Sequence, residues 1–303
     1  MRIAHLSDLH LCSNFKKSNI TKIKGLIEHA LENGAQHFVF TGDISDNAEE
    51  KELIQFRDLL QSFSLLHSEK SSIVIGNHDI FGGPQTAQDV LNFPFKCLNV
   101  SYKEKVMRFA GHFHELFENT IRPHEEVFFP FIKELKNIVL IGLNSIDEYS
   151  RIKNPFASNG RISKANRNII RSYLTRPKFN DKVKIVLIHH HFYQKSEIST
   201  SSENTLWNKI ESYTMKLRGK KKLLNLFSEN NVKLVLHGHS HEMREYFRKK
   251  IRFVNAGACT EEKRASYFMI DAFPFDISVN LHKPDLKEDE VVGNEEGITS
   301  IAV

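Results

Sequence analysis

Short apolar runs of strand length recur along the chain, and most of them end in polar residues. Several are almost continuous in Val, Ile, Leu and Phe, which is typical of strands covered on both faces of a sheet. The predicted strands are 2–7, 37–41, 72–75, 137–143, 183–188, 233–236 and 252–254. Between them, apolar residues repeat at helical spacing over 19–33, 49–63, 163–174 and 223–230. Strands that alternate with helices predict a layered α/β fold.

The composition is that of an ordinary globular protein. The 303 residues are 40% hydrophobic and 26% charged, which excludes collagen-like and disordered chains. No apolar run approaches the ~18 residues that a membrane helix needs, and residues 1–10 lack the apolar region of a secretory signal. Three cysteines, Cys12, Cys97 and Cys259, are too few for a disulfide framework. We therefore expect a cytoplasmic protein without a membrane span.

Three stretches interrupt the alternation of strands and helices. Residues 80–136 are rich in Phe and Pro, and we expect an insertion there, with a helix at about 104–119 that caps one end of the sheet. Residues 192–222 are polar and then basic, which predicts a long loop leading into a helix. Residues 281–303 predict an acidic C-terminal tail. We expect one domain over residues 1–280 that contains both insertions.

Basic residues are concentrated in two stretches, although the formal net charge is only +5. Residues 209–222 hold six Lys or Arg and one Glu, and residues 244–252 hold five and one. Such stretches form solvated helix faces or bind anions such as nucleic acid. Charge alone does not separate these two interpretations.

Side chains with carboxylate, imidazole or amide groups come directly after five of the predicted strands. The segments are D-L-H with Asp8 and His10, G-D-I-S-D with Asp43 and Asp46, G-N-H-D with Asn77 and His78, H-H-H at 189–191, and G-H-S-H with His239 and His241. In open α/β sheets, sites form outside the carboxyl ends of the strands. These side chains are therefore expected to meet at one place.

The chemistry that suits this set is metal binding. Carboxylate and amide oxygens together with imidazole nitrogens fit Mn, Fe, Zn or Co better than Ca or Mg. D-x-H and H-x-H each place two ligands on the same side of an extended chain. Seven strong ligands are too many for one tetrahedral site and match two metals that share a carboxylate. Each motif alone also fits a simple turn or a packed histidine, so the order of all five carries the prediction.

The five motifs in this order resemble the signature of the calcineurin-like metallophosphoesterase superfamily. The resemblance covers roughly residues 1–80 and 137–260, and it implies a four-layer α/β/β/α sandwich with a dinuclear site at one sheet edge. The implied ligands of the first metal are Asp8, His10 and His241, those of the second are Asn77, His189 and His239, and Asp43 bridges the two. His78 would polarise the phosphate or protonate the leaving oxygen, and Asp46 would orient a ligand.

The fourth motif departs from the family pattern. The family often has H-H-P at this point, whereas this chain has H-H-H-F-Y. We favour His189 as the ligand because it comes first after the apolar run, and His190 is the alternative.

The resemblance implies a hydrolase in which two metal ions activate a hydroxide that attacks a phosphodiester. The H-H-H run and the segments 142–145 and 160–163 resemble the class III cyclic-nucleotide phosphodiesterases, which implies a cyclic nucleotide or a related small diester as the substrate. A DNA phosphodiesterase of the same superfamily is the alternative that the basic stretches favour. Hydrolysis of a nucleotide-linked lipid is a further alternative. A metal-bound scaffold without catalysis is disfavoured, because all seven ligand positions are filled.

Overall fold

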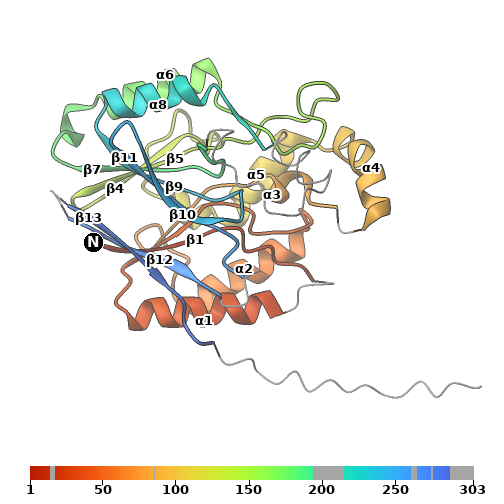
Figure 1. Ribbon diagram of the computed structural model, residues 1–303, viewed down its shortest axis with the longest axis horizontal. Coiled ribbons are helices and arrows are strands. Elements are labelled where there is room, and N and C mark those ends of the chain that lie inside the picture. Colours follow the sequence, from red (N-terminus) through yellow and green to blue (C-terminus); the bar gives the residue numbers. More distant parts are fainter. Residues whose placement is uncertain (14–17, 85, 194–214, 261–264, 274–275, 287–303) are drawn as a thin grey trace, which may run out of the picture.

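The computed structural model describes residues 1–13, 18–84, 86–193, 215–260, 265–273 and 276–286 (Figure 1). Two sheets form its centre. The five-stranded sheet has the order β13-β12-β1-β2-β3 and contains β1 (Arg2–Leu6), β2 (His37–Phe40), β3 (Ser71–Ile73), β12 (Tyr267–Ala272) and β13 (Ile277–His282). The six-stranded sheet has the order β10-β11-β9-β7-β5-β4 and contains β4 (Phe131–Leu135), β5 (Ile138–Gly142), β7 (Val183–Leu187), β9 (Val232–His237), β10 (Met243–Arg248) and β11 (Ile251–Ala256).

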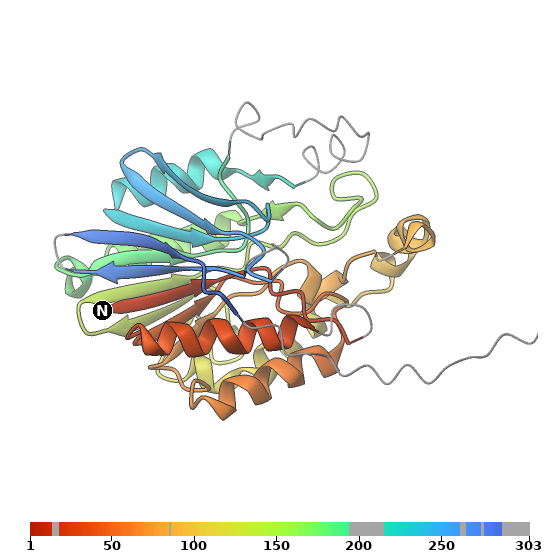
Figure 2. The same ribbon diagram turned by 60° about the horizontal axis from the view of Figure 1, so that its bottom comes forward.

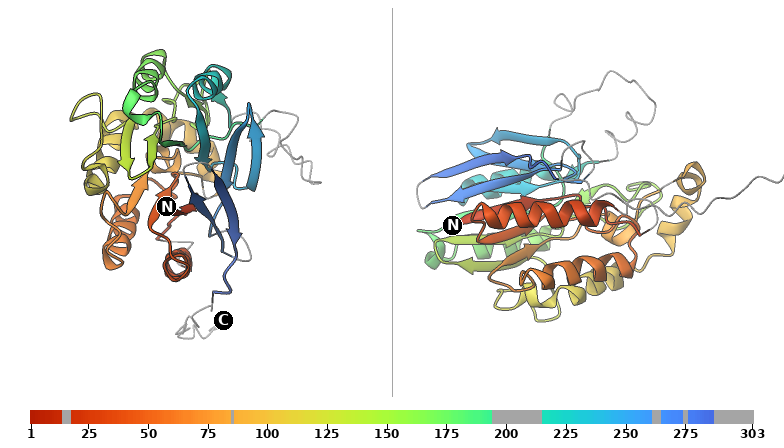
Figure 3. Two further views of the ribbon diagram at one scale, coloured as in Figure 1. Left: turned by 90° about the vertical axis from the view of Figure 1, so that its left-hand side faces the viewer. Right: turned by 90° about the horizontal axis from the view of Figure 1, so that it is seen from below.

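Helices cover the outer face of each sheet, and this produces four layers. The left view of Figure 3 shows helices both above and below the sheets. The five-stranded sheet is covered by α1 (Ser18–Glu32) and α2 (Glu50–Ser62), and the six-stranded sheet by α6 (Lys164–Leu174) and α8 (Lys220–Glu229). The predicted α/β/β/α sandwich is therefore confirmed.

The continuous apolar runs are explained by burial on both faces. In β5, Ile138 and Leu140 join the core that includes the facing sheet, whereas Val139 and Ile141 join the core beneath α6 and α8. Successive side chains of a strand point to opposite faces, so a strand between two covered faces must be apolar at every position. Burying one such side chain stabilises the fold by about 1.5–3 kcal/mol.

The region between β3 and β5 differs from the predicted insertion. It contains α3 (His78–Phe81), α4 (Ala87–Leu98), α5 (Tyr102–His112) and a short 3-10 helix, His114–Phe117. Residues 131–135, which we assigned to the insertion, instead form β4 and pair antiparallel with β5. The strands β10, β12 and β13 are also absent from the sequence prediction.

The two polar stretches near the C-terminus are only partly described. Residues 194–214 of the predicted basic loop lie outside the described residues. The rest of that stretch forms β8 (Leu217–Arg218), which pairs with β6 (Gly160–Arg161), and the first turn of α8. Residues 281–282 of the predicted acidic tail belong to β13, and residues 287–303 lie outside the described residues. Within the described part, no helix combines the length and the apolarity that crossing a bilayer requires.

Parallel pairing brings the carboxyl ends of the central strands to one end of the molecule. β1, β2 and β3 pair in parallel in one sheet, as do β5, β7, β9 and β11 in the other. Hydrogen bonds join the loops that leave these strands. Within each sheet, the amide of Asp8 donates to Gly42 and that of Gly238 to His189; between the sheets, the amide of His239 donates to the Asp8 carboxylate at 3.0 Å. In Figure 2 this end lies on the right, beside α4. Loops from both sheets therefore share one rim.

A buried lysine joins the two sheets where their edge strands β3 and β4 lie side by side. Lys133 lies on the edge strand β4, and its Nζ donates to the backbone oxygen of Ser71 on the edge strand β3, at 2.5 Å. Burial lowers the pKa of Lys133 to about 7. Burial and the charge of Lys133 together lower the pKa of the neighbouring His37 to about 3.

This lysine predicts a specific pH dependence of stability. The unfolded chain holds the proton of Lys133 up to about 10.5, whereas the folded chain releases it near 7. The ammonium therefore lowers stability at and below neutral pH, and this cost disappears as the pH rises. Between pH 7 and about 9, we expect the free energy of unfolding of the native chain, minus that of Lys133→Met, to rise by up to ~1.4 kcal/mol per pH unit.

Urea unfolding at several pH values measures this difference. The exposed Lys24 of α1 provides the control, since the difference between the native chain and Lys24→Met should not vary with pH. Parallel stability curves for the native chain and Lys133→Met would contradict the expected titration.

Candidate metal centre

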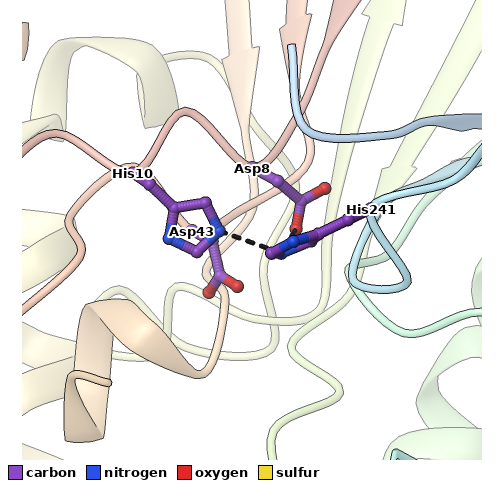
Figure 4. Close-up of side chains that lie close together, drawn as sticks. All are labelled: Asp8, His10, Asp43 and His241. Carbon is purple, nitrogen blue, oxygen red and sulfur yellow. Dashed lines mark hydrogen bonds and ion pairs between the residues drawn. The ribbon is translucent and has the colours of Figure 1, made fainter. Parts of the chain in front are cut away.

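Side chains that follow five strands meet at the shared rim. They form three groups of candidate ligands. Two of them share Asp43: the first cluster is Asp8, His10, Asp43 and His241, and the second cluster is Asp43, His189 and His239. The third group, His10, Asp46 and His78, adjoins the first cluster. Within each cluster the candidate ligand atoms lie within 4.8 Å of one another. Figure 4 shows the first cluster, with the imidazoles of His10 and His241 facing each other. Asp43 belongs to both clusters, so one carboxylate lies between two groups of donors.

The first cluster is oriented by hydrogen bonds to its outer atoms. His10 Nδ1 donates to Asp46 Oδ1 at 2.9 Å, which leaves Nε2 without a proton and 3.0 Å from Nε2 of His241. The Asp8 carboxylate accepts from the backbone amide of His239 at 3.0 and 3.1 Å. Its Oδ1 lies 3.7 Å from Nε2 of His241. The lone pairs needed for a metal therefore face inward.

The second cluster is oriented in the same way. His189 Nδ1 donates to the carbonyl oxygen of Thr41 at 2.8 Å. Its Nε2 lies 3.2 Å from Asp43 Oδ2, 3.1 Å from Asn77 Oδ1 and 3.1 Å from His239 Nδ1. An amide oxygen, a carboxylate and two imidazoles thus surround one point.

The neighbouring His190 is engaged elsewhere. Its Nε2 donates to the carbonyl oxygen of Ser158 at 3.1 Å, and its Nδ1 lies 2.8 Å from the hydroxyl of Ser145. Both ring nitrogens are therefore used outside the clusters. The His190 ring instead packs 4.3 Å from the ring of His239. Of the two alternatives that the sequence left open, this geometry favours His189 as the ligand.

His78 lies at the outer edge of the first cluster. Its Nδ1 donates to the backbone oxygen of Asp46 at 3.1 Å, and its backbone amide donates to Asp43 Oδ1 at 2.8 Å. The ring lies 4.7 Å from that of His10, and the side chain is 23% exposed. Nδ1 is anchored, so Nε2 is the atom of His78 that can reach a bound molecule. The nine predicted site residues thus lie together.

The arrangement fits two metal ions that share Asp43. Pairs of imidazole nitrogens face each other at 3.0 and 3.1 Å. A cation bound between the two lone pairs of such a pair would remove their mutual repulsion. The mixed nitrogen and oxygen donors suit Mn, Fe, Zn or Co.

The backbone of the site is strained. Five candidate ligands have positive φ angles, a conformation that is uncommon outside glycine: Asp8 at 51°, His10 at 45°, Asp43 at 51°, His239 at 75° and His241 at 54°. Such residues cost about 1–3 kcal/mol each and persist where the surrounding structure enforces them, which is frequent at functional sites. At these positions the backbone turns sharply after its strand, so that the side chain points into the rim.

Charges of opposite sign are paired in the site. Burial lowers the pKa of His189, but the Asp43 carboxylate outweighs burial and raises it to about 9. The pKa of His78 is raised to about 9 by the same balance, with Asp43 and Asp46 against burial. Burial opposes ionisation of Asp43, but His189 and His78 hold its pKa well below its ordinary range. A metal ion would replace the proton of His189 as the partner of this carboxylate.

Asp79 is a site residue that sequence reasoning missed. Its carboxylate accepts from the backbone amides of Ser45 and Gly76, at 2.9 and 2.8 Å, and so ties the loop after β2 to the turn after β3. Burial and the nearby Asp43 raise its pKa to about 7. The signal was present as the last letter of G-N-H-D, to which we assigned no role of its own.

Comparison with known proteins agrees with this geometry. A sequence profile of the family described as calcineurin-like phosphoesterase matches residues 1–243. A search of curated protein sequences found no significant match.

Solved structures share the fold. The chain is similar to a dimetal phosphatase from Danio rerio, with 10% identity and a TM-score of 0.62 over 93% of this chain and 96% of that one. It is also similar to the purple acid phosphatase PPD1 from yellow lupin seeds, with 13% identity and a TM-score of 0.57 over 93% of this chain and 51% of that one.

The close approach of Gly76 to Asp43 can be tested directly. A Cβ on Gly76 would lie 2.1 Å from Asp43 Oδ1 and 2.2 Å from the Asp43 amide nitrogen, so Gly76→Ala must displace the shared carboxylate. We expect the variant to lose at least half of its bound metal and about 1–3 kcal/mol of stability. Elemental analysis and thermal unfolding measure the two effects.

Gly111 offers a matched control. It lies in α5, and a Cβ there would meet no atom within 4 Å. Gly111→Ala should retain all of the metal and gain up to ~1 kcal/mol from helix propensity. Full metal content in Gly76→Ala would contradict the inferred role of this approach.

Proposed function

The chain belongs to the calcineurin-like phosphoesterase family and is therefore a hydrolase, and from this premise we propose that it cleaves a phosphodiester at a two-metal centre. The proposed ligands are Asp8, His10 and His241 for one ion, Asn77, His189 and His239 for the other, and Asp43 for both. The substrate that we propose is a cyclic nucleotide or a related small diester.

The observation that carries the proposal is the sharing of Asp43 between the two clusters. A single-metal site would need only one of them. Two metal ions held by these residues would supply Lewis acidity toward the phosphoryl oxygens and a strong nucleophile from water at neutral pH. The chain's own contribution is to hold seven donors in fixed orientations through outer hydrogen bonds such as that of His10 with Asp46.

His78 is placed to act as a general acid. The leaving group of a phosphoester is an alkoxide, which departs more easily when it receives a proton. His78 is anchored at Nδ1 by the Asp46 backbone oxygen and is partly exposed beside the first cluster, so Nε2 is placed to donate to the substrate. We assign to His78 the role of the general acid and to Asp46 that of positioning both His78 and His10.

The resemblance of the H-H-H run and of the segments 142–145 and 160–163 to cyclic-nucleotide phosphodiesterases supports the proposed substrate class. A cytoplasmic location is also part of the proposal. It is supported by the three cysteines, which are buried and free, as expected in a reducing compartment.

The basic residues of 244–252 give the nuclease alternative little support. Arg252 contacts Glu245 at 3.2 Å and donates to the backbone oxygen of Ile277. The Arg248 guanidinium lies 5.3 Å from the centre of the Tyr246 ring, a cation–π contact. Arg252 therefore joins neighbouring strands, and Arg248 packs against a residue of its own strand. A groove that tracks a phosphate backbone would instead present a continuous row of cations to solvent.

The shared carboxylate provides the first test of the proposal. We expect Asp43→Asn to lose metal from both positions and to reduce phosphodiester turnover by at least about a thousandfold, because the amide cannot supply a charged bridging ligand. Elemental analysis and hydrolysis of bis(p-nitrophenyl) phosphate provide the measurements. Asp58→Asn on the exposed face of α2 is the control and should behave as the native chain. Full activity of metal-depleted Asp43→Asn would exclude the two-metal mechanism.

A substrate panel tests the diesterase assignment. With Mn present, we expect kcat/KM for bis(p-nitrophenyl) phosphate and for cAMP or cGMP to exceed that for p-nitrophenyl phosphate by at least about tenfold, with all activity lost to a chelator. His78→Gln should retain metal but lower kcat by about 10²–10⁴-fold, the usual contribution of a general acid. A preference for the monoester would overturn the assignment, and cleavage of short DNA at low salt would favour the nuclease.

A further inference from the structure

We propose that the rim carrying the metal centre docks on an anionic lipid surface, with the exposed apolar face of α4 and the tip of the 147–159 loop inserted among the head groups. This inference goes beyond the proposed function and does not rest on it. It follows from the placement of apolar and basic side chains at that end of the molecule.

The first observation is an apolar stripe along α4. Leu91, Phe95 and Leu98 are spaced by four and three residues, so they lie on one side of the helix. Their exposed fractions are 69%, 66% and 45%. On the opposite side of the helix, Phe93 and Cys97 are buried in the core. The helix is therefore fastened to the protein by one apolar face and presents a second apolar face to solvent.

The second observation is an isolated apolar tip on the 147–159 loop. Ile152 is 91% exposed, and it lies between the exposed cations Arg151 and Lys153. Figures 1 and 2 both show this loop projecting at the same end of the molecule as α4. The loop is fixed to the start of α5, since Tyr102 Oη donates to the Ile146 backbone oxygen at 2.9 Å.

The stripe adjoins the metal centre. Lys96 of α4 approaches the turn that follows His78 closely, and a Cβ on Gly82 would lie 2.9 Å from its Nζ. The next residue, Gly83, packs against the His78 ring, which a Cβ there would meet at 2.3 Å. Whatever surface α4 contacts therefore lies beside the partly exposed edge of the site. Docked in this way, the rim would present the centre to phosphoesters at the lipid surface.

The charges at this end favour an anionic bilayer over a second protein. Arg151 and Lys153 flank the Ile152 tip, and Lys96 lies next to the stripe. Of the acids nearby, Asp89 closes a capping box with Thr86 at the start of α4. Asp147 lies 3.6 Å from Arg218, and Glu148 is exposed at the start of the loop rather than at its Ile152 tip. Apolar side chains ringed by Lys and Arg match the boundary between acyl chains and acidic head groups.

Vesicle sedimentation tests the proposal with the full chain. The native protein should sediment with vesicles of phosphatidylcholine and phosphatidylglycerol at low salt, and much less with pure phosphatidylcholine. We expect Leu91→Ser combined with Phe95→Ser to lower the partition coefficient at least about tenfold, because two large apolar groups are removed from the interface. Arg151→Gln combined with Lys153→Gln should lower it about fivefold for each charge removed.

The double variant Phe247→Ser/Phe273→Ser is the matched control. These residues are 54% and 53% exposed and lie away from the rim, so their loss should leave sedimentation unchanged. Thermal unfolding and turnover of bis(p-nitrophenyl) phosphate without lipid should be the same for the stripe variant and the native chain, which separates docking from folding and catalysis. Equal sedimentation of the native chain and the stripe variant would overturn the proposal. So would a native dimer that the stripe variant dissociates without any vesicle binding, since the stripe would then be a self-association face.

Discussion

The rest of the site depends on the Asp43 carboxylate. It is buried at the end of β2, its Oδ1 accepts from the backbone amide of His78, and its Oδ2 lies 3.2 Å from His189. A buried anion must be compensated by cations or by hydrogen bonds, and here the compensating groups come from loops of both sheets. Asp43 therefore joins the two halves of the sandwich at the rim. The close approach of Gly76 completes this arrangement, because a larger residue would occupy the space of the carboxylate.

The strands that could be predicted from the sequence are those covered on both faces. β5 and β7 are apolar at almost every position, because each lies between the facing sheet and a helix layer. Three of the four strands missed in the two central sheets, β4, β10 and β13, lie at sheet edges. β10 (Met243–Arg248) contains three charged residues, and β13 (Ile277–His282) is nowhere fully buried. The fourth, β12 (Tyr267–Ala272), is almost fully buried between β1 and β13 and was missed although its sequence is mostly apolar. β4 (Phe131–Leu135) was hidden by the Phe- and Pro-rich stretch before it. An edge strand owes its place to pairing with a distant segment, which periodicity does not record.

The residues of the site were easier to predict than their contacts. Motifs after strand ends identified the nine side chains that the structure brings together, because parallel strands deliver their carboxyl ends to one place. The choice between His189 and His190 needed coordinates, since it depends on Ser145 and Ser158, which lie far from the motif in sequence. The positive φ angles could not be predicted either, because Asp and His, unlike glycine, do not by themselves indicate such a backbone conformation. Asp79 shows the opposite error, in which a residue inside a motif was given no role.

The exposed stripe of α4 shows a different limit of sequence reasoning. Leu91 and Phe95 lie on one side of the helix, and Phe93 and Cys97 on the other, so the segment has the apolar pattern of a buried helix. Periodicity reports which faces are apolar but not what covers them. The fold covers only one of these faces, and the other remains 45–69% exposed along Leu91, Phe95 and Leu98. The described part of the chain covers one of the two apolar faces of α4, and in our proposal a lipid surface covers the other. The stripe therefore carries functional information that the buried core does not.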